Sequence, residues 1–307
     1  MLDCYIWGAV ERVSPEAPVP IVSVRKRDVR LGGAANVALN VQALGASPIL
    51  CALVGDDDTG RRLIQTLSER GISSEGIVIS AERPTTVKTR VIASHQHVVR
   101  VDEESDALAS LSEENRLLEK IERLLPTCDV VIFEDYNKGV LTASLIEKSI
   151  TLSNKLGIPT IVDPKKRNFF SYKNVTLFKP NLKELREGLK TDINAGDQLQ
   201  ITSAVESLKS MLNAKGILVT LSEHGAYIDF EDQQIKLAAH VREIADVSGA
   251  GDTVVSIAAL CIALKLESKL IVSLSNLGGG LVCQHVGVVP IDKDEFFSEA
   301  QKLLLPA

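Results

Sequence analysis

Residues 246–253 read Asp246-Val-Ser-Gly-Ala-Gly-Asp252-Thr253, and an apolar segment typical of a helix follows them. Gly249, Ala250 and Gly251 carry no bulky side chain, so the backbone N–H groups at the start of that helix stay accessible to an anion, which the helix dipole favours. Asp252 falls in the first turn. Its carboxylate can cap the helix, or it can accept a proton from a hydroxyl that attacks a phosphoryl group held by those N–H groups. The motif alone leaves both interpretations open.

A second glycine-rich stretch lies near the start of the chain, Gly32-Gly33-Ala-Ala-Asn36, and Gly45 and Gly55 follow it. One interpretation is close packing of a helix against a strand. The other is that the two adjacent glycines let the backbone approach a polyhydroxylated ligand, to whose hydroxyls Asn36 offers its amide.

The order of predicted elements indicates an α/β fold. From residue 112 onward, helices alternate with short apolar strands at 130–133, 160–162, 176–178 and 217–220. This alternation is typical of a mostly parallel sheet covered by helices on both faces. The predicted helices are 112–125, capped by Ser112, then 142–156, one that ends at Met211, and 251–266, 269–286 and 292–304.

Two β segments, near 10–30 and 85–102, are too polar for such a sheet, and we expect them to form a small β lid. The sequence has no convincing linker, so residues 1–307 are expected to form a single domain.

Composition argues against several classes of protein. The chain has 34 basic and 40 acidic residues, and aromatic residues make up 4%. A duplex-binding protein usually presents a basic face, and a single-strand binder an aromatic platform, so no nucleic-acid partner is expected. No apolar run is long enough to cross a membrane, and no secretory leader is recognisable. Five scattered cysteines are typical of reduced thiols in a cytoplasmic protein rather than of a zinc site.

Together, the two glycine-rich stretches resemble the two signatures of the ribokinase-type carbohydrate kinases, also called the phosphofructokinase-B family. The resemblance covers nearly the whole chain, with one departure at Ile257, where the family usually has a small residue. It implies a ribokinase-like fold and an enzyme that transfers a phosphoryl group from ATP to a sugar with the help of Mg²⁺. A Walker-type phosphate loop is absent from the sequence, which excludes that kind of kinase.

Within the family, five stretches are most similar to the kinases of D-glycero-β-D-manno-heptose 7-phosphate, namely 12–20, 88–96, 100–102, 135–139 and 162–165. This similarity implies phosphorylation of the anomeric hydroxyl in the synthesis of ADP-heptose, a precursor of the lipopolysaccharide core. Some relatives add a nucleotidyltransferase domain with an H-x-G-H motif. That motif does not occur here, so kinase activity alone is expected.

The resemblance also implies roles at matching positions. Asp252 is implied to be the base that activates the sugar hydroxyl, and Gly249, Ala250 and Gly251 are implied to form the anion hole. Lys88 and Arg100 can equally be ordinary surface charges of the lid. The residues implied to hold the sugar phosphate are Asp3, Gly32, Gly33, Asn36, Lys88, Arg100, Asp135 and Lys138.

The nucleotide side of the site is implied by two further motifs. Asn181-Leu-Lys-Glu184 resembles the family's Asn-x-x-Glu motif, which orients the nucleotide phosphates and Mg²⁺, with Glu184 acting through water. The segment 220–225 resembles the nucleotide loop, and Asn276 matches a position near the adenine. The implied nucleotide ligands are therefore Asn181, Glu184, Thr220, Ser222, Gly225 and Asn276. Asp246 and Ser248 match a region that binds a monovalent cation such as K⁺ in some relatives.

Two alternatives stay open. The chain could be a kinase of another sugar or a nucleoside, because lid residues decide the substrate, or it could be a catalytically silent regulator that binds sugar or nucleotide. We expect a homodimer that forms through the lid strands, since exposed β edges invite pairing.

The start of the chain carries one more expectation. In the family, a central strand precedes the sugar-binding aspartate, whereas here Met1-Leu-Asp3 stands at the end of that strand. Loss of a central strand would leave buried backbone groups unpaired, at about 1–3 kcal/mol each. We therefore expect the natural protein to begin upstream, and an extension of some 15 residues to raise both the melting temperature and the sugar affinity.

Overall fold

The computed structural model describes residues 1–93, 96–240 and 242–304. Its main sheet has six strands in the order β12-β11-β10-β9-β8-β7. The four strands that carry the site run parallel to one another, whereas β11 and β12 are antiparallel additions at one edge. Their bounds are β7 Val131–Glu134, β8 Thr160–Asp163, β9 Leu177–Phe178, β10 Gly216–Thr220, β11 Ala226–Phe230 and β12 Gln233–Leu237.

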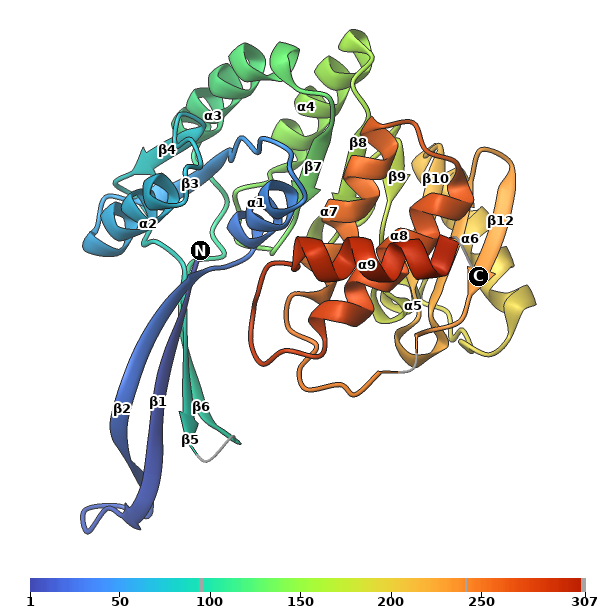
Figure 1. Ribbon diagram of the computed structural model, residues 1–307. Helices are drawn as coiled ribbons and strands as arrows, with labels where there is room; N and C mark the ends of the chain where they lie inside the picture. Colours follow the sequence, from blue (N-terminus) through green and yellow to red (C-terminus); the bar gives the residue numbers. More distant parts are fainter. Residues whose placement is uncertain (94–95, 241, 305–307) are drawn as a thin grey trace.

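Helices cover both faces of this sheet, as predicted (Figure 1). One face packs against α7 and α8, and the core there is built from apolar residues such as Val255 and Ile271. The other face packs against α4, α5 and α6 through residues such as Ile146, Leu185 and Val205. The helices are α1 Ala34–Ala43, α2 Asp58–Glu69, α3 Leu111–Leu124, α4 Ala143–Leu156, α5 Leu182–Leu189, α6 Gln198–Leu212, α7 Ala250–Ala263, α8 Ser268–Val282 and α9 Lys293–Leu304.

A second, two-stranded parallel sheet pairs β3 (Ala52–Gly55) with β4 (Ile77–Ser80). It packs against α2 and α3. Among the described residues its strands pair only with each other, so β3 and β4 form a sheet separate from the main one.

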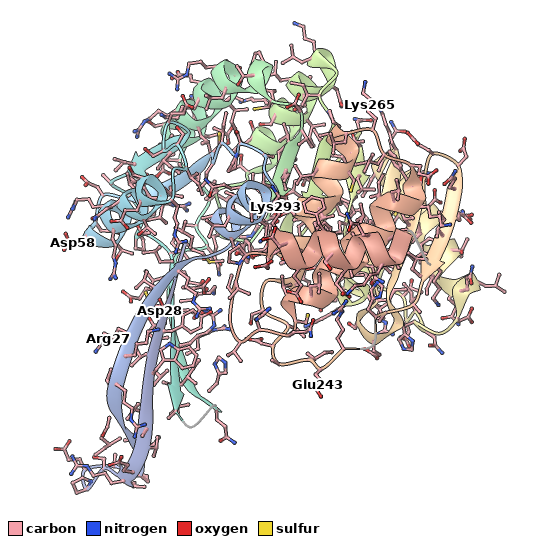
Figure 2. The ribbon with its side chains drawn as sticks, in the orientation of Figure 1. Arg27, Asp28, Asp58, Glu243, Lys265 and Lys293 are labelled. Carbon is pink, nitrogen blue, oxygen red and sulfur yellow. The ribbon has the colours of Figure 1, made fainter. Side chains whose placement is uncertain are left out.

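The predicted lid is present as a four-stranded sheet in the order β2-β1-β5-β6, and it projects away from the body of the protein (Figure 1). Its strands are β1 Leu2–Val13, β2 Pro20–Leu31, β5 Val87–Ala93 and β6 Gln96–Glu103. The lid is larger than predicted, because β1 begins at Leu2 rather than near residue 10. Arg27 and Asp28 mark strand β2 in Figure 2.

Three local predictions were wrong for identifiable reasons. Ser110, not Ser112, caps α3: its hydroxyl accepts from the Glu113 N–H while the Glu113 carboxylate accepts from the Ser110 N–H. The helix expected to end at Met211 is two helices, because Lys190 takes a left-handed conformation that ends α5. The β11–β12 hairpin was missed, since its turn is made by Glu231 and Asp232, both with positive φ, and contains no glycine.

Among the described residues, no helix combines the length and the apolar character needed to span a bilayer. The five cysteines are free thiols, as expected.

Candidate active site

The site lies where the parallel strands of the main sheet end. Strands β7 and β8 finish at Glu134 and Asp163, and β9 is followed directly by Lys179. Ligands of open α/β sheets bind at this carboxyl edge. The amino ends of α1 and α7 meet at the same place, because these two helices pack against each other.

The turn before α7 is shaped by its glycines. Gly249 caps the helix with φ of +83°, a left-handed conformation that side chains rarely adopt. A Cβ on Gly251 would lie 3.4 Å from Asp163 Oδ2 and 3.8 Å from Lys179 Nζ. Lys179 and Asp163 form a buried ion pair at 3.0 Å. The start of α7 thus lies beside this ion pair. The helix dipole favours an anion at that end, while the Ala250 N–H donates to the Val247 carbonyl at 3.3 Å.

Asp252 occupies the first turn of α7 and is buried. Its Oδ2 accepts a hydrogen bond from Asn36 Nδ2 at 2.8 Å, and its Oδ1 accepts one from the Tyr136 hydroxyl at 2.9 Å. Burial raises the pKa of Asp252 to about 6, against the lowering effect of these two donors and of Lys179. A carboxylate with this pKa is mostly ionised at neutral pH and is still a competent proton acceptor.

Asn36 is held rigidly on α1. Its backbone carbonyl accepts from Asn40 Nδ2 at 2.9 Å, and the Thr253 hydroxyl donates to Asn40 Oδ1 at 3.2 Å. The Asn36 amide nitrogen is used by Asp252, whereas its Oδ1 atom is buried and has no hydrogen-bond partner. An unpartnered buried acceptor beside the carboxylate is suited to a ligand hydroxyl.

Asp3 reaches the same region from strand β1. A Cβ on Gly32 would lie only 1.8 Å from Asp3 Oδ2, so glycine is required for the close approach of the two segments. Gly33 has φ of +59° and packs against Met1 and the Tyr136 ring. Asp3 is 2% exposed and forms an ion pair with Arg90 of β5, a residue that the sequence analysis did not single out.

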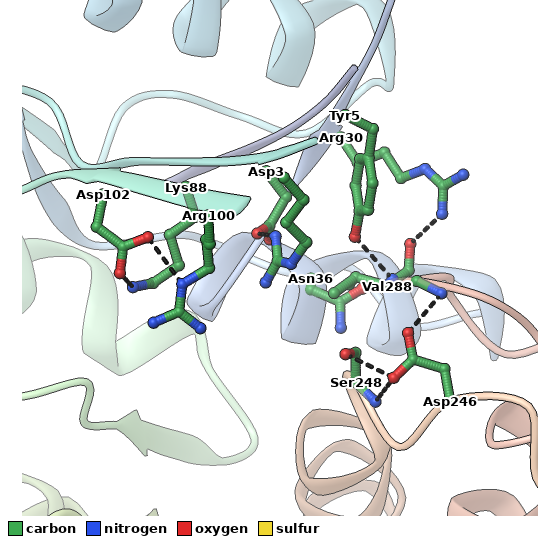
Figure 3. Close-up of polar contacts among 12 residues, drawn as sticks. Asp3, Tyr5, Arg30, Asn36, Lys88, Arg100, Asp102, Asp246, Ser248 and Val288 are labelled. Carbon is green, nitrogen blue, oxygen red and sulfur yellow. Dashed lines mark hydrogen bonds and ion pairs between the residues drawn. The ribbon is translucent and has the colours of Figure 1, made fainter. Parts of the chain in front are cut away.

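The cations expected to meet a substrate phosphate gather with acidic partners (Figure 3). Lys88 donates to Asp102 at 3.0 Å and to Glu104 at 3.1 Å. Arg100 donates to Asp102 at 2.9 Å, and Lys138 pairs with Glu104. These side chains therefore form one charged cluster between the lid and the loop after β7.

Asp135, one of the residues expected to hold the sugar phosphate, follows directly after strand β7. Its carboxylate accepts from the Asn137 N–H, from Asn168 Nδ2 and from the Tyr172 hydroxyl, and it is 2% exposed. These contacts hold the loop after β7 in place. The structure gives Asp135 an internal, loop-forming set of partners.

The Asn-x-x-Glu segment forms the amino end of α5. Asn181 and Glu184 make a capping box, in which Glu184 Oε2 accepts from the Asn181 N–H at 2.8 Å. Glu184 Oε1 accepts from Lys165 Nζ at 2.7 Å. Glu184 is therefore joined to the end of β8, at the edge of the sheet where Asp163 and Lys179 lie.

The expected nucleotide loop follows β10. Thr220 ends that strand, and Ser222 and Gly225 both have positive φ in the tight turn that leads to β11. A Cβ on Gly225 would lie 1.9 Å from the Leu237 carbonyl oxygen. Asn276 of α8 donates to the Ala238 carbonyl at 2.9 Å. The close approach of Gly225 to Leu237 and the hydrogen bond from Asn276 to Ala238 hold this turn and α8 against the segment after β12.

Asp246 and Ser248 hold the loop that leads into the anion-binding turn (Figure 3). Asp246 accepts from the Ser248 N–H and hydroxyl and from the Gly287 N–H. The lid contacts the loop after α8, to which Gly287 belongs: the Val288 N–H donates to the Tyr5 hydroxyl, and Arg30 donates to the Val288 carbonyl. The hydrogen bonds of Asp246 thus shape the loop before α7 and join it to the loop after α8.

Sequence reasoning missed Tyr136, Lys179 and Arg90 as site residues. Tyr136 lies inside the stretch 135–139 that was already recognised, and Lys179 stands two residues before Asn181. Only the pairing of β1 with β5, which sets Arg90 beside Tyr5, brings Arg90 within reach of Asp3.

Sequence comparison identifies relatives that are carbohydrate kinases. The pfkB family carbohydrate kinase model matches residues 4–294. The bifunctional protein HldE of Campylobacter curvus is 39% identical over 305 residues, which cover 99% of this chain and 63% of that protein. The HldE protein of Magnetococcus marinus is 40% identical over 96% of this chain and 61% of its own length. The chain thus spans less than two thirds of these relatives.

Solved structures agree in fold. Phosphofructokinase-2 from Escherichia coli in complex with potassium superposes with a TM-score of 0.80 at 20% identity, covering 97% of this chain and 94% of that one. A ribokinase-like protein from Agrobacterium tumefaciens, described as a putative ribokinase, gives 0.76 at 21% identity over 100% and 96%. The fold is therefore ribokinase-like, and the chain belongs to the pfkB family of carbohydrate kinases.

Proposed function

We propose that this kinase transfers the γ-phosphoryl group of ATP to the anomeric hydroxyl of D-glycero-β-D-manno-heptose 7-phosphate, with Asp252 as the base. The observation that carries the proposal is the buried Asp252 carboxylate beside the glycine-lined anion turn. A proton acceptor and an anion-binding turn in adjacent positions are what phosphoryl transfer to a hydroxyl requires.

In the proposed reaction the sugar hydroxyl gives its proton to Asp252 while its oxygen bonds to the γ-phosphorus. The bond from that phosphorus to the β-bridging oxygen breaks, and ADP leaves. The N–H groups of Gly249 to Gly251 stabilise charge on the transferred group, and Lys179 adds a positive charge close by. Asn36 Oδ1 has the free acceptor capacity to bind a sugar hydroxyl.

A divalent cation fits the charges at the sheet edge. Glu134, Asp163 and Glu184 surround Lys165, and these carboxylates raise the pKa of its ammonium against the effect of burial. Glu134 Oε2 is buried without a hydrogen-bond partner. Among the described residues, however, no group of three or more potential ligands converges into a closed metal site.

This arrangement suits Mg²⁺ held by one or two carboxylates, water and nucleotide phosphates. Bound there, Mg²⁺ would neutralise charge on the phosphates, with Glu184 as the proposed ligand through water. The turn at Thr220, Ser222 and Gly225, together with Asn181 and Asn276, is the proposed nucleotide site. For Asp246 and Ser248 a monovalent-cation role stays a prediction, which a K⁺ titration of the velocity tests.

The charged residues of the lid support the proposal that the acceptor is a phosphorylated sugar. Asp3 and Arg90 stand beside the Asn36 region, and Lys88, Arg100 and Lys138 provide cations further along the lid face. We propose that a substrate phosphate draws these cations from Asp102 and Glu104, since charge-assisted contacts to phosphate are strong. The heptose assignment rests on the lid and loop stretches that resemble heptose 7-phosphate kinases.

The experiment is an ADP-release assay across a panel of acceptors. Heptose 7-phosphate is expected to give a higher kcat/KM than ribose or fructose 6-phosphate by at least about tenfold, a difference of about 1.4 kcal/mol in transition-state binding. Equal or better use of ribose, fructose 6-phosphate or a nucleoside would favour the alternative kinase. Binding of sugar and ATP without any ADP release would favour the silent regulator.

We also propose a homodimer formed through the lid. The lid face opposite Asp3 carries apolar side chains, of which Val99 and Val101 are each 50% exposed. On that face, a cavity of about 300 Å³ lies between β1, β2, β5 and α2. Burying such a surface against a second copy would remove it from water.

A further inference from the structure

The Tyr136 hydroxyl contacts the Asp252 carboxylate directly, and the reaction described above gives it no role. Tyr136 donates to Asp252 Oδ1 at 2.9 Å, while Asn36 donates to Oδ2 at 2.8 Å. The two carboxylate oxygens are therefore held from opposite sides by side chains of the loop after β7 and of α1.

The position of Tyr136 is fixed by its surroundings. A Cβ on Gly33 would come within 3.2 Å of the tyrosine ring, so the ring packs directly on the glycine turn. The Lys165 ammonium lies 6.0 Å from the ring centroid. On the preceding residue, the Asp135 carboxylate accepts from the Asn137 N–H and from Tyr172. The loop that carries Tyr136 is thus anchored on both sides of it.

The charged groups around Asp252 come from each neighbouring strand end. Glu134 of β7 and Asp163 of β8 oppose its ionisation, whereas Lys179 after β9 favours it. Burial is the largest influence and raises the pKa of Asp252 to about 6, while the hydrogen bonds from Asn36 and Tyr136 lower it. Burial and the Asp252 charge also raise the pKa of Tyr136 well above its usual value, so its hydroxyl remains a proton donor throughout the working range.

We propose that Tyr136 is a positioning residue for Asp252: its hydroxyl orients the carboxylate and stabilises the ionised form that accepts the substrate proton. The inference rests on the proposed role of Asp252 as the base. It assigns a function to the aromatic residue of the Asp135-Tyr-Asn-Lys-Gly stretch that the sugar-binding interpretation left without one.

The test is the pH profile of kcat/KM for Tyr136→Phe, which reports the pKa values of the free enzyme. Loss of one hydrogen bond to the charged carboxylate is expected to move the acidic limb of this profile upward by about one pH unit, equal to about 1.4 kcal/mol. With the pKa of Asp252 starting at about 6, protonation then lowers kcat/KM about fivefold at pH 6, about twofold at pH 7 and hardly at all at pH 8.5. Loss of packing alone would lower kcat/KM by the same factor at every pH.

Tyr227→Phe is the matched control. Tyr227 is a fully buried tyrosine of β11 whose hydroxyl lies 3.1 Å from Thr202 Oγ1, away from the site. Its variant is expected to keep the wild-type pH profile. A second probe replaces Tyr136 with 3-fluorotyrosine, whose more acidic phenol is a stronger donor and should move the acidic limb downward without changing the shape of the side chain.

The outcomes separate this inference from the proposed function. An upward shift in Tyr136→Phe and a downward shift with fluorotyrosine support it. An unmoved limb, or a loss that is equal at all pH values, overturns it. If Tyr136→Phe fails to fold, the protein with 3-fluorotyrosine at position 136 provides the test. An unchanged acidic limb in its pH profile would also overturn the inference. Turnover that survives in Asp252→Asn would instead refute the base itself.

Discussion

Replacing Lys179 by methionine tests how the site is held together. Lys179 is 2% exposed and pairs with Asp163, which is 5% exposed, at 3.0 Å. Methionine has nearly the same volume and no charge, so the variant leaves a buried carboxylate without its main partner. Removal of one member of a buried pair typically costs about 3–5 kcal/mol. For a chain of 307 residues this corresponds to a fall of about 5–8 °C in melting temperature.

The assay is thermal and urea unfolding of Lys179→Met beside two comparison variants. Asp163→Asn/Lys179→Met should recover part of the loss, because residue 163 then carries no charge that needs Lys179 as its partner. Lys209→Met should lose less, since Lys209 is 26% exposed and its partner Asp229 keeps a hydrogen bond from Gln234. If Lys179→Met melts within about 2 °C of the wild type, the ion pair does not stabilise the site as argued.

Two further predictions concern magnesium and assembly. Glu184→Gln should raise the Mg²⁺ concentration for half-maximal velocity severalfold, because the amide is a weaker partner for the metal's water shell. Glu187→Gln, on the same helix but with its side chain 40% exposed, should not, and equal Mg²⁺ titrations for both would refute the assignment of Glu184. Val101→Asp should convert a dimer to a monomer in sedimentation velocity, whereas Leu199→Asp, 83% exposed on α6, should leave it intact. A wild-type monomer at micromolar concentration would contradict assembly through the lid.

The α/β architecture could be predicted because its signals are local. Apolar strand runs, helix periodicity and the glycine turns at residues 32–33 and 249–251 each specify their own element. The helix boundaries that were predicted wrongly depend on which of two neighbouring residues caps the helix. In α3 the N-cap is Ser110 and not Ser112. The β11–β12 hairpin was not predicted because its turn is formed by Glu231 and Asp232. Both have positive φ, a conformation for which glycine or asparagine is the usual sequence signal.

In the site, sequence reasoning identified the groups that a motif carries. Asp252 and Asn36 are brought into hydrogen bonding although 216 positions separate them. Tyr136, Lys179 and Arg90 could not be identified in the same way. Their importance comes from contacts between distant segments, and neither a buried tyrosine nor a lysine before a proline is a signal by itself. The internal hydrogen bonds of Asp135 could not be predicted from the sequence either, because a carboxylate after a strand is as consistent with ligand binding as with loop formation.

The most direct measurement is single-turnover phosphoryl transfer by Asp252→Asn with radiolabelled ATP and heptose 7-phosphate. The asparagine keeps the size of the side chain and can still hydrogen-bond to Asn36 and Tyr136, but it cannot take up the substrate proton. We predict that the transfer rate falls by at least about 100-fold while ATP affinity, measured by calorimetry, stays within about threefold of wild type. Transfer at a near wild-type rate would contradict the account, because the proton would then have another acceptor.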